Sequence, residues 1–177
     1  PREPLRLVLR SSEASNERLV VLRGLPGPFP SAVAFARCAA DADPGLVGVV
    51  RLLTAPGRRG GAAVETIAGR AWIAEEVHGI SFRLPAATFF QVHRAAAERL
   101  LEHVLEWAGS ARQVLEIYGG VGALGLALAR RGAAATIIDA DPAAIACGTE
   151  AARSLGLGDV SLERADVLDY LVRRRAG

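Results

Sequence analysis

The chain has 177 residues, of which 51% are hydrophobic and 23% are charged, and its formal net charge is +2. This balance excludes an extensively disordered protein, because a chain of this length and apolar content can bury a core. Its apolar runs are far shorter than the roughly 20 residues that cross a bilayer, and its N-terminus lacks the basic-then-apolar pattern of a signal peptide. We therefore expect a cytoplasmic protein that does not enter a membrane.

The basic residues give an unspecific signal. All 21 of them are arginines, and the net charge is small, so their number is weak evidence for an anionic partner. Two groups are candidate RNA contacts, although a solvated charge cluster is the simpler explanation of each. They are Arg58 with Arg59 in a glycine-flanked turn, and Arg173–Arg175 near the end of the chain.

The cysteine spacing predicts neither a disulfide framework nor a metal site. Cys38 and Cys147 are the only two cysteines, and they lie far apart in the sequence. We expect both to be buried as small hydrophobic side chains. Neither is assigned a catalytic role, and no metal ligands are predicted.

The first 88 residues predict a small α+β unit. A polar turn joins two β-like segments, 5–10 and 19–23, so a hairpin is expected. Prolines and Ser31 then precede a helix over 32–40, in which Val33, Phe35 and Ala36 form the expected buried face. Four further strands follow, at 46–53, 62–67, 72–77 and 80–84.

A different pattern, with alternating strands and helices, begins near Thr88. Residues 91–107 form an amphipathic helix with Val92, Ala96, Leu100, Val104 and Trp107 on its apolar stripe. The strands are then expected at 113–118, 134–139 and 160–164, with helices at 123–131, at 142–155 and from 167. Such alternation predicts a parallel, doubly wound, Rossmann-like α/β sheet in a second domain over 89–177.

A glycine-rich turn between a strand and a helix is the most informative stretch. Residues 114–125 read Val-Leu-Glu-Ile-Tyr-Gly-Gly-Val-Gly-Ala-Leu-Gly. Glycines allow backbone amides to approach a ligand without obstruction by a Cβ atom. Gly120, Gly122 and Gly125 also satisfy G-x-G-x-x-G, the dinucleotide fingerprint, which is weak evidence by itself. The turn therefore predicts a nucleotide-like ligand.

Acidic residues at three successive strand ends favour S-adenosylmethionine (SAM) over a dinucleotide. Glu116 is placed to take the cationic methionine portion, directly or through water, and Asp139 to accept from the ribose hydroxyls. Asp166 is placed to accept from the adenine amino group. Plainer alternatives remain, namely an edge-exposed charge at Glu116, a residue of a helix N-cap region at Asp139 and a helix N-cap at Asp166. Asp141 before Pro142 is itself interpreted as an N-cap.

Two motifs together resemble the RNA uracil-5-methyltransferases of the tRNA and 23S rRNA type. They are Phe89-Phe90-Gln91-Val92-His93 and, about twenty residues later, Val114-Leu115-Glu116-Ile117-Tyr118-Gly119-Gly120-Val121-Gly122. Members of that family show a phenylalanine pair, then Gln-Val-Asn, a connecting helix and Val-Leu-Asp-Leu-Tyr-Cys-Gly-x-Gly. The preceding hairpin, helix and strands also look like the family's central domain, so the resemblance covers nearly the whole chain.

The resemblance implies a SAM-dependent methyltransferase that acts on uracil C5 of tRNA or rRNA. A glutamine amide can pair with the amino-acid portion of SAM, and an aromatic ring at position 118 can cover its apolar surface. His93, where the family usually has Asn, is more simply structural. The implied cofactor-contacting positions are Gln91, Tyr118, Asp139 and Asp166, with Gly120 and Gly122 in the loop.

The family's reacting groups have no counterpart among these residues. Family members use a cysteine thiolate that adds to C6 and a carboxylate that removes the C5 proton, both beyond a fourth-strand Asp-Pro-Pro motif. We expect a truncated sheet, a chain that is inactive alone, and an open apolar edge at 114–118 that self-associates. A non-catalytic SAM- or RNA-binding protein and a methyltransferase of another substrate remain alternatives.

Overall fold

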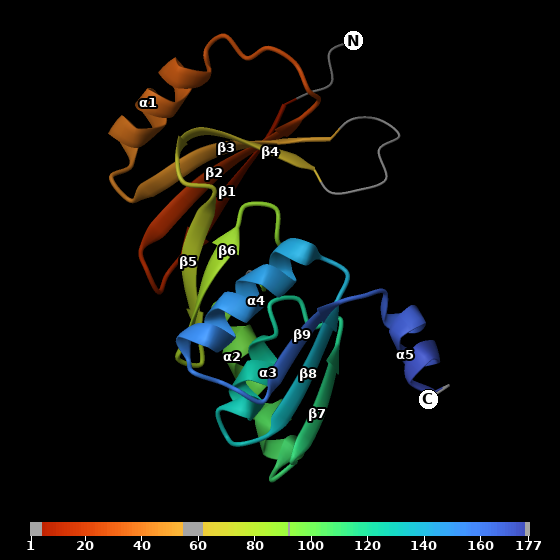
Figure 1. Ribbon diagram of the computed structural model, residues 1–177. Helices are drawn as coiled ribbons and strands as arrows, with labels where there is room; N and C mark the ends of the chain where they lie inside the picture. Colours follow the sequence, from red (N-terminus) through yellow and green to blue (C-terminus); the bar gives the residue numbers. More distant parts are fainter. Residues whose placement is uncertain (1–4, 55–61, 92, 176–177) are drawn as a thin grey trace. The chain divides into compact units, whose positions relative to one another are not determined.

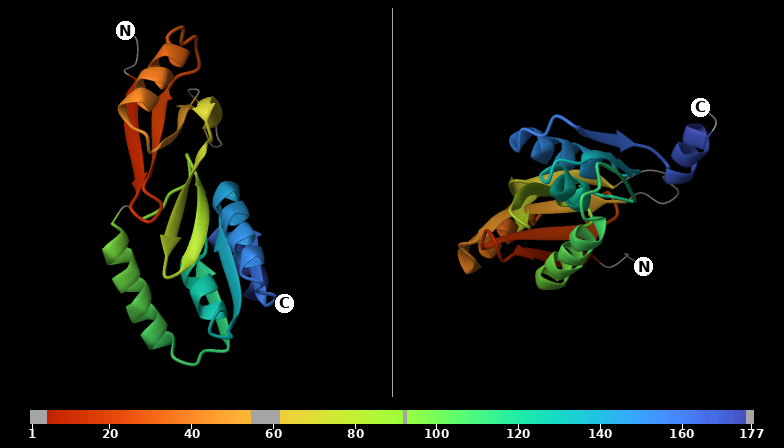
Figure 2. Two further views of the ribbon diagram at one scale, coloured as in Figure 1. Left: turned by 90° about the vertical axis from the view of Figure 1, so that its left-hand side faces the viewer. Right: turned by 90° about the horizontal axis from the view of Figure 1, so that it is seen from below.

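The computed structural model describes residues 5–54, 62–91 and 93–175, which fold as two compact units (Figure 1; Figure 2). Unit 1 contains the described residues up to Glu75 together with Arg83–Ala87. Unit 2 contains Glu76–Phe82 and the described residues from Thr88 onward. The segment at residues 76–82 thus belongs to unit 2 although it is flanked in the sequence by residues of unit 1. A boundary near residue 88 between independently folding domains remains a prediction.

Unit 1 is built on a four-stranded sheet in the order β1-β2-β3-β4. β1 (Arg6–Ser12) and β2 (Glu17–Gly24) form the predicted antiparallel hairpin. β3 (Leu46–Leu53) has the predicted bounds and runs parallel to β2, and β4 (Ala63–Gly69) is antiparallel to β3. Arg58 and Arg59, between β3 and β4 in the sequence, lie outside the described residues.

The helix α1 (Ala32–Ala42) connects β2 to β3 and packs on one face of this sheet (Figure 1). Phe35 is partly buried against the core, as predicted, and Ala36 is only 4% exposed. Val33 is 68% exposed and Cys38 is exposed, so the expected burial of these two side chains was wrong. Phe35 and Ala36 therefore face the sheet, whereas Val33 and Cys38 project outward. The core cluster comprises Val20, Leu22, Ala36 and Val49.

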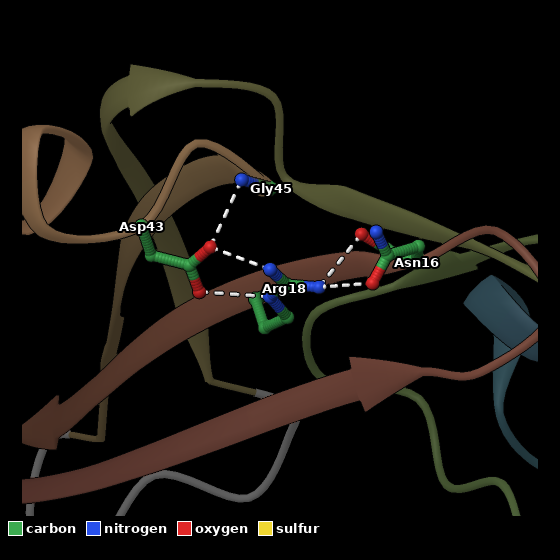
Figure 3. A network of polar contacts seen from close by, with 4 residues as sticks. All are labelled: Asn16, Arg18, Asp43 and Gly45. Carbon is green, nitrogen blue, oxygen red and sulfur yellow. Dashed lines mark hydrogen bonds and ion pairs between the residues drawn. The ribbon is translucent and has the colours of Figure 1, made fainter.

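Arg18 on β2 joins the strand to the end of α1 (Figure 3). Its Nε donates to Asp43 Oδ2 at 2.7 Å, and its Nη2 lies 2.6 Å from Asp43 Oδ1. Asp43 also accepts from the Gly45 amide, while Arg18 Nη1 donates to the Asn16 carbonyl oxygen. The bidentate arginine–carboxylate pair therefore fixes the turn that leads into β3.

β5 (Trp72–Val77) and β6 (Ile80–Pro85) form a two-stranded hairpin. The turn residues His78 and Gly79 have φ values of 50° and 69°. Positive φ at both central residues is the requirement of a type I′ turn, which suits the twist of paired strands. The hairpin therefore closes at the two residues that separate the predicted strands.

The helix α2 (Arg94–Ala108) exposes much of the predicted apolar stripe, of which Val92 lies outside the described residues. Leu100 is 60% exposed and Trp107 is 82% exposed, whereas Leu101 and Leu105 are 6% and 0% exposed. α2 has apolar residues on two adjacent stripes, and the one that packs faces α3. Periodicity alone does not distinguish these stripes, because both have helical spacing.

Unit 2 contains a parallel sheet in the order β7-β8-β9 (Figure 1). α3 packs against β7 and β8, and α4 packs against β8 and β9. The alternating α/β pattern predicted from the sequence is confirmed. None of the described helices is long and apolar enough to span a membrane. The elements are β7 (Gln113–Ile117), α3 (Ala123–Ala129), β8 (Ala134–Asp139), α4 (Pro142–Ser154), β9 (Val160–Arg164) and α5 (Val167–Arg175).

Candidate functional site

A tight glycine turn joins β7 to α3 at the C-terminal end of the sheet. Tyr118, Gly120 and Gly122 have φ values of 55°, 58° and 77°. The Gly119 amide donates to the Ile138 carbonyl at 3.0 Å, and the Gly122 amide donates to the Gly119 carbonyl at 2.8 Å. The turn is therefore held to β8 and closed on itself at the start of α3, as in nucleotide-binding loops.

Gly120 and Gly122 are needed in this turn for different reasons. A Cβ atom at Gly122 would lie 2.7 Å from Ile137 Cδ1, so Gly122 allows the loop to pack on β8. A Cβ atom at Gly120 would meet nothing within 4 Å. Gly120 thus borders open space and has a positive φ that disfavours other residues. A ligand can approach the backbone at this position.

Asp139, at the end of β8, is bound to this loop. Its Oδ2 accepts from the Gly120 amide at 2.7 Å, and its Oδ1 accepts from the Asp141 amide at 2.8 Å. Each carboxylate oxygen can accept more than one hydrogen bond. The structure therefore brings Asp139 and Gly120 together, and leaves acceptor capacity on the carboxylate beside the loop.

Glu116 lies between β7 and α3 instead of projecting from the sheet edge. Its Oε2 accepts from the Gly125 amide at 2.7 Å. Burial raises the pKa of the Glu116 carboxyl to about 7; hydrogen bonds from the Gly125 and Leu124 amides oppose this rise, and the charge of Asp139 adds to it. Glu116 therefore changes protonation near neutral pH at the base of the glycine loop.

Tyr118 and Gln91 are both exposed. Tyr118 is 71% exposed and has a positive φ, a conformation that is costly for a residue with a Cβ atom. It directly precedes the glycine turn, so its ring is available to a ligand there. Gln91 lies ahead of α2, and no described hydrogen bond joins it to the loop. The structure thus groups Tyr118 with the loop and does not group Gln91 with it.

Asp166 follows β9 and caps α5. Its Oδ1 accepts from the Leu168 amide at 2.9 Å and from the Asp169 amide at 3.2 Å, which is the helix-cap alternative considered from the sequence. Asp141 similarly caps α4, accepting from the Ala143 amide at 2.9 Å, with Pro142 in the first helical turn. Since β8 and β9 are parallel neighbours, Asp166 still lies at the same sheet edge as Asp139.

His93 and Cys147 have structural surroundings. His93 Nδ1 accepts from the Ala96 amide at 3.2 Å as the N-cap of α2. Cys147 is buried in α4, as predicted. The Glu116–Gly125 contact was not predicted from the sequence, although Gly125 is the third glycine of the fingerprint and lies in the first turn of α3.

No protein-family model matches the chain. It is 35% identical over 142 residues to an uncharacterized RNA methyltransferase of Thermosynechococcus vestitus, a match covering 75% of this chain and 30% of that protein. It is also 40% identical over 73 residues to the human tRNA (uracil-5-)-methyltransferase homolog A, covering 40% of this chain and 12% of that protein. The chain therefore spans 30% or less of the length of these two relatives.

A solved structure has the same fold over nearly all of the chain. It is the Pyrococcus abyssi tRNA (uracil-54, C5)-methyltransferase in complex with S-adenosyl-L-homocysteine, with a TM-score of 0.73 and 22% identity. The match covers 92% of this chain and 39% of that one. The chain is therefore a relative of the RNA (uracil-5-)-methyltransferases and has the Rossmann-like fold of SAM-dependent methyltransferases.

Proposed function

We propose that this chain binds SAM at the C-terminal ends of β7, β8 and β9, as the cofactor-binding part of an RNA methyltransferase. The observation that supports this most directly is the open backbone at Gly120, whose amide is held by the carboxylate of Asp139. A glycine, which has no Cβ atom, lies here beside a carboxylate that can accept further hydrogen bonds. This arrangement suits a nucleoside, because its ribose hydroxyls are donors.

The bound SAM would supply the methyl group, and the chain's own residues would hold it. Asp139 would accept from the ribose hydroxyls, and Gly120 and Gly122 would line the loop. Tyr118 would cover the apolar part of the cofactor, while Glu116 would provide negative charge for its methionine portion. Asp166 and Gln91 are proposed for the adenine amino group and the amino-acid portion, on the strength of the sequence resemblance.

Uracil C5 of tRNA or rRNA is the proposed target, and the cytoplasm the proposed location. The relatives' names support an RNA substrate. We further infer that these 177 residues alone transfer no methyl group, because uracil C5 requires a nucleophile at C6. Cys147 is buried in α4 and is therefore not accessible to a uracil base.

Isothermal titration calorimetry with SAM tests this proposal through Asp139→Asn. The substitution leaves one amide-accepting oxygen but removes the negative charge that would face the ribose. We expect the Kd for SAM to rise at least tenfold, about 1.4 kcal/mol. Glu163→Gln, an exposed change on β9, is the matched control and should leave the Kd unchanged. Equal affinities for Asp139→Asn and wild type would remove Asp139 from the site, and a wild-type chain without SAM affinity would contradict the function.

A further inference from the structure

Two arginines face each other across the β1–β2 hairpin. Arg6 on β1 is the direct partner of Arg23 on β2, and both side chains are exposed. Directly opposed residues of an antiparallel pair project from the same face of the sheet, where like charges destabilise the pairing. The hairpin therefore keeps a repulsive pair at a position where an acidic residue would be favourable.

Three other arginines of unit 1 have carboxylate partners. Arg18 pairs with Asp43 at 2.6 Å, as Figure 3 shows, and Arg51 pairs with Glu65 at 2.8 Å. Arg70 pairs with Glu17. In the described ranges, by contrast, no carboxylate forms an ion pair with Arg6 or Arg23. Charge compensation is thus common in this unit and is missing at the Arg6–Arg23 pair.

A third arginine increases the positive charge on this face. Arg10 lies four residues after Arg6 on β1, so its side chain projects from the same face. Its guanidinium donates to the carbonyl oxygens of Pro85 and Ala86. Burial lowers the pKa of Arg10, the positive charge of Arg23 lowers it further, and the charge of Glu75 partly opposes this. The guanidinium of Arg10 is therefore occupied by contacts within unit 1, whereas the exposed guanidinium groups of Arg6 and Arg23 are available to a ligand.

We propose that Arg6 and Arg23 together bind a backbone phosphate of RNA. Opposed strand positions have Cβ atoms about 5 Å apart, so two long guanidinium side chains can converge on one phosphate group. Arginine matches phosphate oxygens with paired donors, and such contacts position RNA without reading its sequence. The inference rests on the proposed RNA substrate and assigns unit 1 a part in holding it.

The test measures binding of fluorescently labelled, unmodified tRNA transcript by anisotropy over a series of salt concentrations. The double variant Arg6→Gln/Arg23→Gln should weaken binding at least tenfold and lower the slope of log K against log salt by about one for each arginine removed. Arg37→Gln, an exposed change on α1, is the control and should stay within about twofold of wild type.

A second variant separates binding from folding. Arg23→Glu converts the repulsive pair into an attractive one, so its melting temperature should equal or exceed that of wild type while RNA binding is lost. A lower melting temperature would indicate a structural role for Arg23 and overturn the inference. RNA affinity that is absent in wild type, or unchanged in the double variant, would also overturn it. Because SAM binding is measured without RNA, either result leaves the cofactor proposal to its own test.

Discussion

Glu116→Gln is expected to stabilise the protein at pH 8 and to have little effect at pH 5. The Glu116 carboxyl has a pKa of about 7 in the folded chain and an ordinary value of 4.5. A raised pKa means that the folded state binds the proton more tightly, so this contribution to stability is present below pH 4.5 and is lost as the pH rises through 7. The whole difference amounts to roughly 3 kcal/mol.

Chemical denaturation of wild type and variant at both pH values measures this effect. The glutamine Oε1 can still accept from the Gly125 amide, so the loop contact is retained in the variant. Glu163→Gln, on the exposed surface of β9, controls for the removal of one negative charge. If wild type and Glu116→Gln lose stability in parallel from pH 5 to pH 8, the Glu116 carboxyl does not have the raised pKa.

Self-association through β7 is the second expected result. β7 is an edge strand of the described sheet, with Leu115 39% exposed and Ile117 42% exposed. The opposite edge, β9, carries charged Glu163 and Arg164, which protect a strand against pairing. An apolar edge with unpaired backbone groups is a template for another chain. The 177-residue polypeptide should therefore form dimers or larger species at high concentration.

Static light scattering of wild type and Leu115→Lys/Ile117→Lys tests this surface. We expect the average mass of wild type to rise with concentration and that of the double variant to remain monomeric. Val172→Lys, an equally apolar-to-charged change on α5 at a side chain that is 69% exposed, should behave like wild type. A monomeric wild type at high concentration, or relief of association by Val172→Lys alone, would contradict a β7 interface.

The strand and helix order was predictable because the period of apolar residues differs between the two element types. β3, β5, β8 and β9 have the predicted bounds. The buried face of α2 was not predictable, because Leu100 and Leu101 each belong to an apolar stripe and only contact with α3 distinguishes them. Val33 and Cys38 on α1 were misjudged for a similar reason, since apolar character does not guarantee burial.

At the candidate SAM site, the strand ends could be predicted from the sequence, but most of the hydrogen bonds made there could not. The contact of Asp139 with the Gly120 amide depends on the path of the turn, in which Tyr118, Gly120 and Gly122 all have positive φ values. The pKa of Glu116 depends on burial beneath α3, which follows from packing and not from spacing. The sequence placed Asp166 at a strand end and left open whether it caps the next helix, and the structure shows that it accepts from two amides of α5.

Binding of the cofactor at the glycine loop can be measured from the backbone amide resonances of the isotopically labelled chain on addition of S-adenosyl-L-homocysteine. We expect saturable shifts at Gly120, Gly122 and the adjoining Tyr118, because the ligand would lie against these amides. The resonances of Val49 and Val50, in the β3 strand of unit 1, should not move. If saturating ligand leaves the three loop amides unchanged, or shifts only resonances of unit 1, the glycine loop does not hold the cofactor.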